Sequence, residues 1–137
     1  MTETFPFTGQ QFIAGQRVAS GEPSLVSLRA QDGEPTGQRF YPASVEEAKQ
    51  AAIAAQQAFV CYSLTNAGQR ADFLETIADE LDAAGDELFA TAHQETALPL
   101  ARLQGERART SGKMRMFAGL LRRGDLFEVR IDTALPE

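Results

Sequence analysis

The chain has 137 residues, of which 43% are hydrophobic and 23% are charged, and its formal net charge is -6. This is the composition of an ordinary globular domain that can bury a usable core. No apolar run approaches the ~18–20 residues of a membrane helix, and the acidic first residues lack the basic character of a secretory signal. A single cysteine allows neither an internal disulfide nor a zinc motif. We therefore expect a protein of the reducing cytoplasm that does not contact membranes.

Residues 1–43 contain closely spaced turn-forming residues with short strands between them, which predicts an N-terminal β-hairpin region. Residues 12–13 and 17–18 flank Ala14-Gly15, and this spacing favours a tight hairpin. Alanine is disfavoured at positive φ, so the sequence leaves the type of this turn open. A second hairpin is expected around Asp32-Gly33.

Helix signals dominate residues 44–125, for which we predict four helices. Ser44 and Glu47 form a capping box, in which each side chain can bond a free backbone N–H at the helix start. Asn66 and Gln69 are the corresponding pair for the second helix. The apolar stripe predicted for the first helix is Ala48, Ala52, Ala55, Phe59 and Tyr62, and the one predicted to be buried in the second is Phe73, Leu74, Ile77, Ala78 and Leu81.

The last two helices are marked by a glycine stop and a proline start. Gly85 ends the second helix, and Asp86 caps a shorter third helix. Pro99 suits the first turn of a long fourth helix that ends near Gly124. Alternating hydropathy after that helix predicts a final strand. The stripe of the fourth helix is Leu103, Arg107, Thr110, Met114, Phe117 and Leu121. The predicted fold class is α+β, with N-terminal hairpins, about four helices and a last strand.

The charges are distributed unevenly along the chain. Residues 44–98 hold ten Asp or Glu against Lys49 and Arg70, whereas residues 102–130 hold seven Arg and Lys113 against three acidic residues. Either the acidic and basic helices neutralise each other, or the basic end meets an anionic partner. The acidic side chains of the second helix are expected to face water: Asp72, Glu75, Asp79, Glu80 and Asp82.

The residue types that usually carry catalysis lack the partners they need. Cys61 is the only thiol and has no histidine or carboxylate patterned beside it, so we expect a buried structural cysteine and not a nucleophile. His93 is the only histidine, which favours a helix-surface or interface position over a triad or a metal site. Residues 105–113 depart from the phosphate-loop spacing and do not form a dinucleotide fingerprint. We therefore predict no catalytic, cofactor-binding or metal-binding residue in this chain.

Four arginines of the fourth helix are the strongest candidates for a binding role: Arg102, Arg107, Arg109 and Arg115. They are either a solvated basic surface with Glu106 interspersed or a site for an anion, to which the guanidinium fork is suited. Nucleic acid is disfavoured because the whole chain is acidic and no aromatic residues are interleaved with the arginines. A small carboxylate substrate is the favoured anion.

The order of these segments resembles the N-terminal part of the NAD(P)-dependent aldehyde dehydrogenases, from roughly Phe12 to Pro136. The segments that carry the resemblance are residues 11–18, Thr36-Gly37, residues 43–48, Ala58-Phe59, Tyr62, Arg70-Ala71, Leu74 and Ala78. Residues 96–110 are more specific. They are similar to the branch that oxidises α-ketoglutarate semialdehyde, usually with NADP, because Ala97-Leu98-Pro99 stands where most other branches carry Gly-Lys-Pro.

The resemblance implies a longer, homo-oligomeric parent enzyme of α/β fold with a Rossmann-type cofactor domain that binds NADP or NAD. Residues 44–125 would form the helical outer part of that domain, and residues 126–137 would begin the oligomerisation segment. Gly105 and Arg109 align with positions that line the substrate tunnel, where an arginine could bind the distal carboxylate of the aldehyde. Arg102 and Arg107 are the next candidates for that role.

By the same resemblance, the nucleophile, the oxyanion-hole asparagine and the general base would follow Glu137. The 137 residues alone are therefore expected to be inactive and to bind no cofactor. The alternative is a non-enzymatic helical domain that docks an anionic partner through its basic C-terminal helix. The coding sequence downstream of Glu137 would discriminate between the two.

Overall fold

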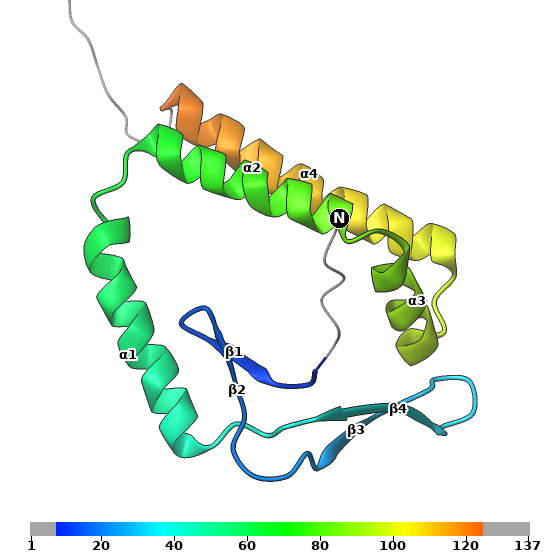
Figure 1. The fold of residues 1–137 in the computed structure, drawn as a ribbon. Helices are drawn as coiled ribbons and strands as arrows, with labels where there is room; N and C mark the ends of the chain where they lie inside the picture. The colour runs from blue at the N-terminus through cyan, green and yellow to red at the C-terminus, as the bar shows by residue number, and fades with distance from the viewer. Residues whose placement is uncertain (1–7, 125–137) are drawn as a thin grey trace, which may run out of the picture. The chain divides into compact units, whose positions relative to one another are not determined.

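The computed structural model describes residues 8–124, within which two β-hairpins are followed by four helices (Figure 1). The elements are β1 (Gln11–Ile13), β2 (Gln16–Val18), β3 (Leu25–Leu28), β4 (Pro35–Phe40), α1 (Val45–Tyr62), α2 (Ala67–Ala83), α3 (Gly85–Thr96) and α4 (Leu100–Arg123). The predicted α+β class is confirmed, while the predicted final strand lies outside the described residues. The described chain divides into two compact units, residues 8–64 with 90–99 and residues 65–89 with 100–124.

The first hairpin shows which turn the sequence uses. β1 and β2 pair antiparallel with Phe12 opposite Arg17. Ala14 has φ 51° and Gly15 has φ 76°, so both central residues take positive φ. Type I′ turns require this, because their twist matches that of the flanking strands. Alanine therefore occupies a position that it disfavours, where an asparagine or glycine would fit more easily.

The second hairpin contacts the backbone of Gly9 at the end of β4. β3 and β4 pair antiparallel, with Leu25 opposite Phe40 and a bulge between Val26 and Leu28. The backbone N–H of Tyr41 donates to the carbonyl of Gly9 over 3.0 Å. Gly9 has φ 69°, and a Cβ built there would lie 2.0 Å from the carbonyl oxygen of Arg39. Only glycine fits this approach of two backbones.

The C-terminal part of α3 belongs to the same unit as this hairpin. The N–H of Ala30 donates to the carbonyl of Gln94 over 3.0 Å, and the hydroxyl of Ser27 donates to the carboxylate of Glu95. These two hydrogen bonds connect the end of β3 and the turn that follows it to the last residues of α3.

Helix α1 starts as predicted, but its predicted stripe is not covered. The hydroxyl of Ser44 accepts from the N–H of Glu47 over 3.1 Å, and the Glu47 carboxylate accepts from the N–H of Ser44 over 2.7 Å. The backbone N–H of Ser44 also lowers the pKa of Glu47. Further along the stripe, Phe59 is 60% exposed and Tyr62 is 47% exposed. Among the described residues, this end of the stripe therefore remains exposed.

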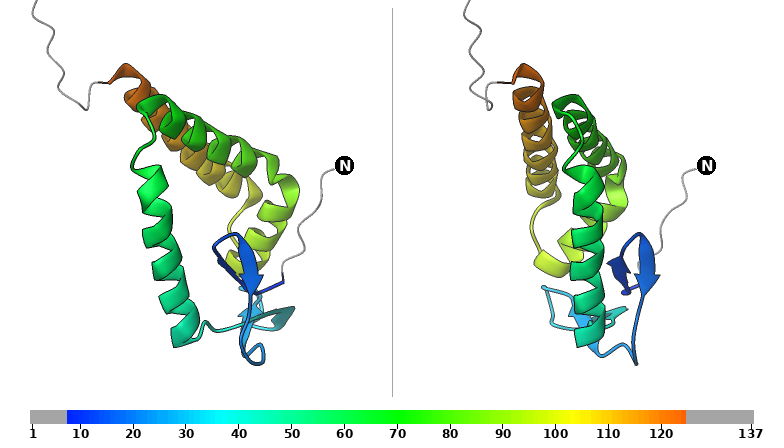
Figure 2. Two further views of the ribbon diagram at one scale, coloured as in Figure 1. Left: turned by 60° about the vertical axis from the view of Figure 1, so that its left-hand side comes forward. Right: turned by 90° about the vertical axis from the view of Figure 1, so that its left-hand side faces the viewer.

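Helices α2 and α4 form the core of the second unit. They lie side by side in every view (Figures 1 and 2) and run antiparallel. The most buried residues of the two helices are small: Ala71, Ala78 and Ala118 have no exposed surface, and Ser111 is 2% exposed. Small side chains let two helices approach closely, with the axes about 8–10 Å apart in such pairs.

This contact corrects both predicted stripes. In α2 the prediction holds for Ala78, but Phe73 is 53% exposed and Ile77 is 36% exposed. In α4 the buried positions are Ser111 and Ala118, one residue beyond the predicted Thr110 and Phe117, which are exposed. The bulky apolar residues that define each stripe in the sequence thus flank a seam built from smaller ones.

The turn into α4 has the predicted proline start. Helix α3 ends at Thr96, and Ala97 adopts the left-handed conformation with φ 57°. The N–H of Ala97 donates to the carbonyl of His93 over 2.8 Å, which closes the last turn of α3. Pro99 then immediately precedes Leu100, the first residue of α4.

Candidate functional site

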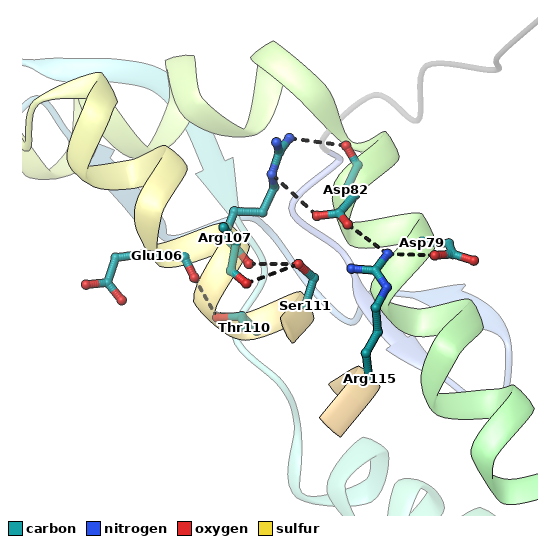
Figure 3. Close-up of polar contacts among 8 residues, drawn as sticks. Asp79, Asp82, Glu106, Arg107, Thr110, Ser111 and Arg115 are labelled. Atoms are coloured by element: carbon teal, nitrogen blue, oxygen red, sulfur yellow. Dashed lines mark hydrogen bonds and ion pairs between the residues drawn. The ribbon is translucent and has the colours of Figure 1, made fainter. Parts of the chain in front are cut away.

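Three arginines of α4 point toward the acidic side of α2. Arg115 contacts Asp79 Oδ1 at 2.7 Å and Asp82 Oδ2 at 2.9 Å (Figure 3). Arg122 contacts Asp72 at 2.7 Å and Glu75 at 2.6 Å. Asp72 and Asp79 face water as predicted, being 67% and 72% exposed, but these carboxylates also bind the arginines of the neighbouring helix. The interpretation in which the acidic and basic helices neutralise each other is confirmed for these residues.

Arg107 is held in the same contact by three different interactions. Its Nη1 donates to the carbonyl of Asp82 over 3.2 Å, and its Nε lies 3.6 Å from Asp82 Oδ1 (Figure 3). The second distance suits an ion pair but is too long for a hydrogen bond, and Nε has no hydrogen-bond partner. The guanidinium also lies 4.8 Å from the centre of the Phe89 ring, a cation–π contact. Arg107 is therefore a packing residue of the helix pair.

The ion pairs shift the pKa values of the groups that form them. The hydrogen bond from Arg115 lowers the pKa of Asp82 below its ordinary value of 3.8, and nearby Arg107 adds to this effect. The hydrogen bonds to Asp79 and Asp82 raise the pKa of Arg115. The directions of both shifts show that opposite charges stabilise this contact.

A second arginine cluster lies on the outer face of α4. Arg102 Nη2 lies 2.9 Å from Oε1 of Glu106, and Arg109 Nη2 lies 2.9 Å from Oε2 of the same carboxylate. The side chains of Arg102 and Arg109 are 65% and 66% exposed. The pKa of Glu106 is lowered, first by the hydrogen bond from Arg102 and then by the charge of Arg109. Two guanidinium groups and one carboxylate leave this cluster with a net positive charge.

Gly105 lies one turn before Arg109 on α4. A Cβ built at Gly105 would meet no atom within 4 Å, and the residue is exposed. Packing among the described residues therefore does not require glycine here. What the glycine does provide is an uncovered helix surface next to the Arg102–Glu106–Arg109 cluster.

The remaining candidate residues fall into structural positions. Cys61 is exposed at the end of α1, so the expectation of a buried cysteine is wrong. His93 lies near the end of α3, where its Nδ1 is 2.7 Å from the carbonyl of Leu98. Within residues 8–124, no group of three or more His, Cys, Asp or Glu could hold a metal ion.

The helices of the described part of the chain include none that is long and apolar enough to cross a membrane. In the sequence Glu106 stands out only as a charge among arginines. Its spacing carries more information, because residues three and four apart on a helix are neighbours. Glu106 stands four residues after Arg102 and three before Arg109.

Comparisons with known proteins agree with the segment order. Residues 19–133 match the aldehyde dehydrogenase family. The chain is 54% identical over 129 residues to an α-ketoglutaric semialdehyde dehydrogenase of Acinetobacter baylyi. This alignment covers 94% of this chain and 24% of the relative. It is 40% identical over 130 residues to α-ketoglutaric semialdehyde dehydrogenase 2 of Azospirillum brasilense, covering 94% of this chain and 25% of the relative.

The fold has a counterpart among solved structures. A NAD-dependent benzaldehyde dehydrogenase from Corynebacterium glutamicum aligns with a TM-score of 0.78 at 18% identity, covering 90% of this chain and 27% of that one. The chain spans about a quarter of the length of the curated relatives it matches. The family match over residues 19–133 shows that this chain belongs to the aldehyde dehydrogenase family.

Proposed function

We propose that this chain is the N-terminal portion of an enzyme that oxidises α-ketoglutarate semialdehyde to the corresponding carboxylate with NAD(P)+. The observation that carries the proposal is the 54% identity to an α-ketoglutaric semialdehyde dehydrogenase over 94% of this chain. The segment at residues 96–110 supports the same branch. No observation favours the alternative of a non-enzymatic domain that docks an anionic partner.

In this proposal the chain contributes substrate recognition, and the chemistry belongs to the rest of the enzyme. Cys61 stands at the exposed end of α1 with no patterned base and is a poor candidate for the nucleophile that attacks an aldehyde. When bound, NAD(P)+ accepts the hydride that leaves the substrate. We place the nucleotide site beyond these residues, because the chain carries no glycine-rich phosphate-binding fingerprint.

We assign Arg109 to the distal carboxylate of the substrate, with Gly105 leaving room for the substrate chain. Arg109 is exposed on the outer face of α4, away from the α2 carboxylates that hold Arg107 and Arg115. Gly105 lies one turn away on the same helix and adds no side chain to that surface. Since Arg107 is fixed between Asp82 and Phe89, Arg102 is the better reserve candidate.

The test is Arg109→Ala in the full-length enzyme. A charge-assisted contact contributes about 1.5–3 kcal/mol, so kcat/KM for the acidic semialdehyde should fall roughly ten- to a hundredfold. Pentanal, a neutral aldehyde of similar length, should be little affected because it never used the contact. Equal losses for both aldehydes would show that Arg109 is structural.

Arg29→Ala provides a matched control. Arg29 is also an exposed arginine, paired with Asp32 over 3.0 Å at the same three-residue separation as Arg109 and Glu106. It lies in the turn between β3 and β4, outside α4. This variant should leave the ratio of the two kcat/KM values unchanged.

The cellular setting and assembly belong to the same proposal. We infer a cytoplasmic homo-oligomer that acts on a small-molecule aldehyde and uses NADP or NAD, with no role in nucleic-acid binding. Exposed apolar side chains such as Phe73 and Phe117 support association with further protein surface. Light scattering of the full-length protein tests the assembly, and a monomer at working concentrations would contradict it.

A further inference from the structure

We infer that Glu106 is a positioning residue that holds Arg109 and Arg102 so that their free guanidinium edges receive a substrate carboxylate. The inference rests on the proposed function and adds a residue to it. It starts from the way the three side chains meet on the outer face of α4.

Both arginines approach Glu106 with the same edge. Arg109 Nε and Nη2 lie 3.1 and 2.9 Å from Oε2 of Glu106. Arg102 Nε and Nη2 lie 3.0 and 2.9 Å from Oε1. Each guanidinium therefore uses its Nε–Nη2 edge to contact one carboxylate oxygen, and each oxygen contacts one arginine.

The second edge of each guanidinium is left out of these contacts. A guanidinium has five N–H donors in a rigid plane, and the Nη1–Nη2 edge can bind a carboxylate through two parallel hydrogen bonds. Glu106 therefore fixes the plane of each fork without occupying the edge that suits bidentate binding. An arginine without this contact would lose more side-chain conformational entropy on binding the substrate.

The charges of the helix favour an anion at this place. Arg107, Arg115 and Arg122 are paired with carboxylates of α2. On the outer face Arg102, Glu106, Arg109 and Lys113 follow one another at separations of four, three and four residues, so they are neighbours on the helix. Three cations and one anion leave a net positive stripe even after Glu106 is counted.

Glu106 acts on the substrate in two opposed ways, and their signs can be separated. Its negative charge repels an acidic substrate, so its removal would raise affinity if charge alone mattered. Its hydrogen bonds orient the two forks, so its removal would lower affinity if orientation matters more. At exposed positions, bulk water and salt screen the repulsion, whereas the geometry of a bidentate contact is lost at once. Orientation should therefore prevail.

The experiment compares Glu106→Gln with the wild type in the full-length enzyme, using α-ketoglutarate semialdehyde and pentanal. We expect kcat/KM for the acidic aldehyde to fall about three- to tenfold, mainly through KM, with pentanal unchanged. Glu46→Gln is the matched control, because Glu46 pairs with Lys49 at 3.7 Å on exposed α1. That variant should behave as the wild type with both aldehydes.

The outcomes separate this inference from the function on which it rests. If the wild type does not favour the acidic aldehyde, the proposed function and this inference both fail. If the wild type favours it but Glu106→Gln leaves its kcat/KM unchanged or raises it, the proposed function stands and the positioning role is wrong. An equal loss for both aldehydes, with a lowered melting temperature, would make Glu106 a structural residue and also overturn the inference.

Discussion

Replacing Ala118 with leucine should disrupt the contact between α2 and α4. Ala118 has no exposed surface and faces a seam that also contains the fully buried Ala71 and Ala78. Leucine inserts a branched side chain where two helices meet through small residues. Overpacking of this kind costs about 1–3 kcal/mol. The intrinsic helix propensities of alanine and leucine are similar, so they change this figure little.

Urea unfolding of the 137-residue chain, followed by far-UV circular dichroism, measures the effect. With a urea m-value of about 2 kcal/mol/M, the midpoint should fall by about 0.5–1.5 M. Ala108→Leu is the matched control, because Ala108 lies on the same helix but is exposed, and it should change the free energy of unfolding by less than about 0.5 kcal/mol. Equal midpoints for the two variants, or a more stable Ala118→Leu chain, would refute the small-residue seam.

Three further predictions address charge, backbone and activity. The pKa of Asp82 is lowered in the folded chain, so its stabilising effect is complete above the unfolded pKa and is lost as pH falls through the folded value. The urea midpoint should therefore drop as pH falls from about 5 to about 3, and Asp82→Asn should reduce that drop. Gly9→Ala should speed hydrogen exchange at the Tyr41 amide more than Gly21→Ala does, because both glycines have positive φ but only Gly9 faces a backbone clash; equal effects would disprove the clash. The isolated chain should not reduce NAD(P)+ with any aldehyde, and activity that disappears in Cys61→Ser would overturn that expectation.

The parts of the fold that depend on local signals could be predicted from the sequence. Hairpins follow from turn residues and alternation, and the helix starts at Ser44 and Asn66 follow from capping boxes whose hydrogen bonds form as expected. The proline start of α4 is local in the same way. Each of these features is decided by residues within four positions of one another.

The buried faces could not be predicted in the same way, because they depend on which neighbour a helix meets. The predicted stripes included Phe73 and Phe117, which are exposed, and omitted Ala71 and Ala118, which are fully buried. Cys61 was misplaced for a similar reason, since burial cannot be derived from residue type alone. The charge blocks did carry long-range information, because mutual neutralisation of an acidic and a basic helix was one of the two alternatives they left open. The structure decides which residues pair, and Arg115 contacts Asp79 and Asp82.

For the candidate site, the sequence supplied Arg109 and Gly105 through the family resemblance, and their role in the substrate tunnel stays a prediction. The structure adds the shared contact with Glu106, which neither hydropathy nor the resemblance indicated. The i, i+3 and i, i+4 spacing was visible in the sequence, but it does not reveal which edge of each guanidinium is used.

We propose that the enzyme to which this chain belongs oxidises a semialdehyde carrying a second carboxylate. The most direct test measures kcat/KM of the full-length enzyme for α-ketoglutarate semialdehyde and for pentanal, with NAD+ and with NADP+. We expect a preference of roughly tenfold or more for the acidic aldehyde with at least one of the two nucleotides. Equal efficiency with both aldehydes, or a preference for pentanal, would contradict it.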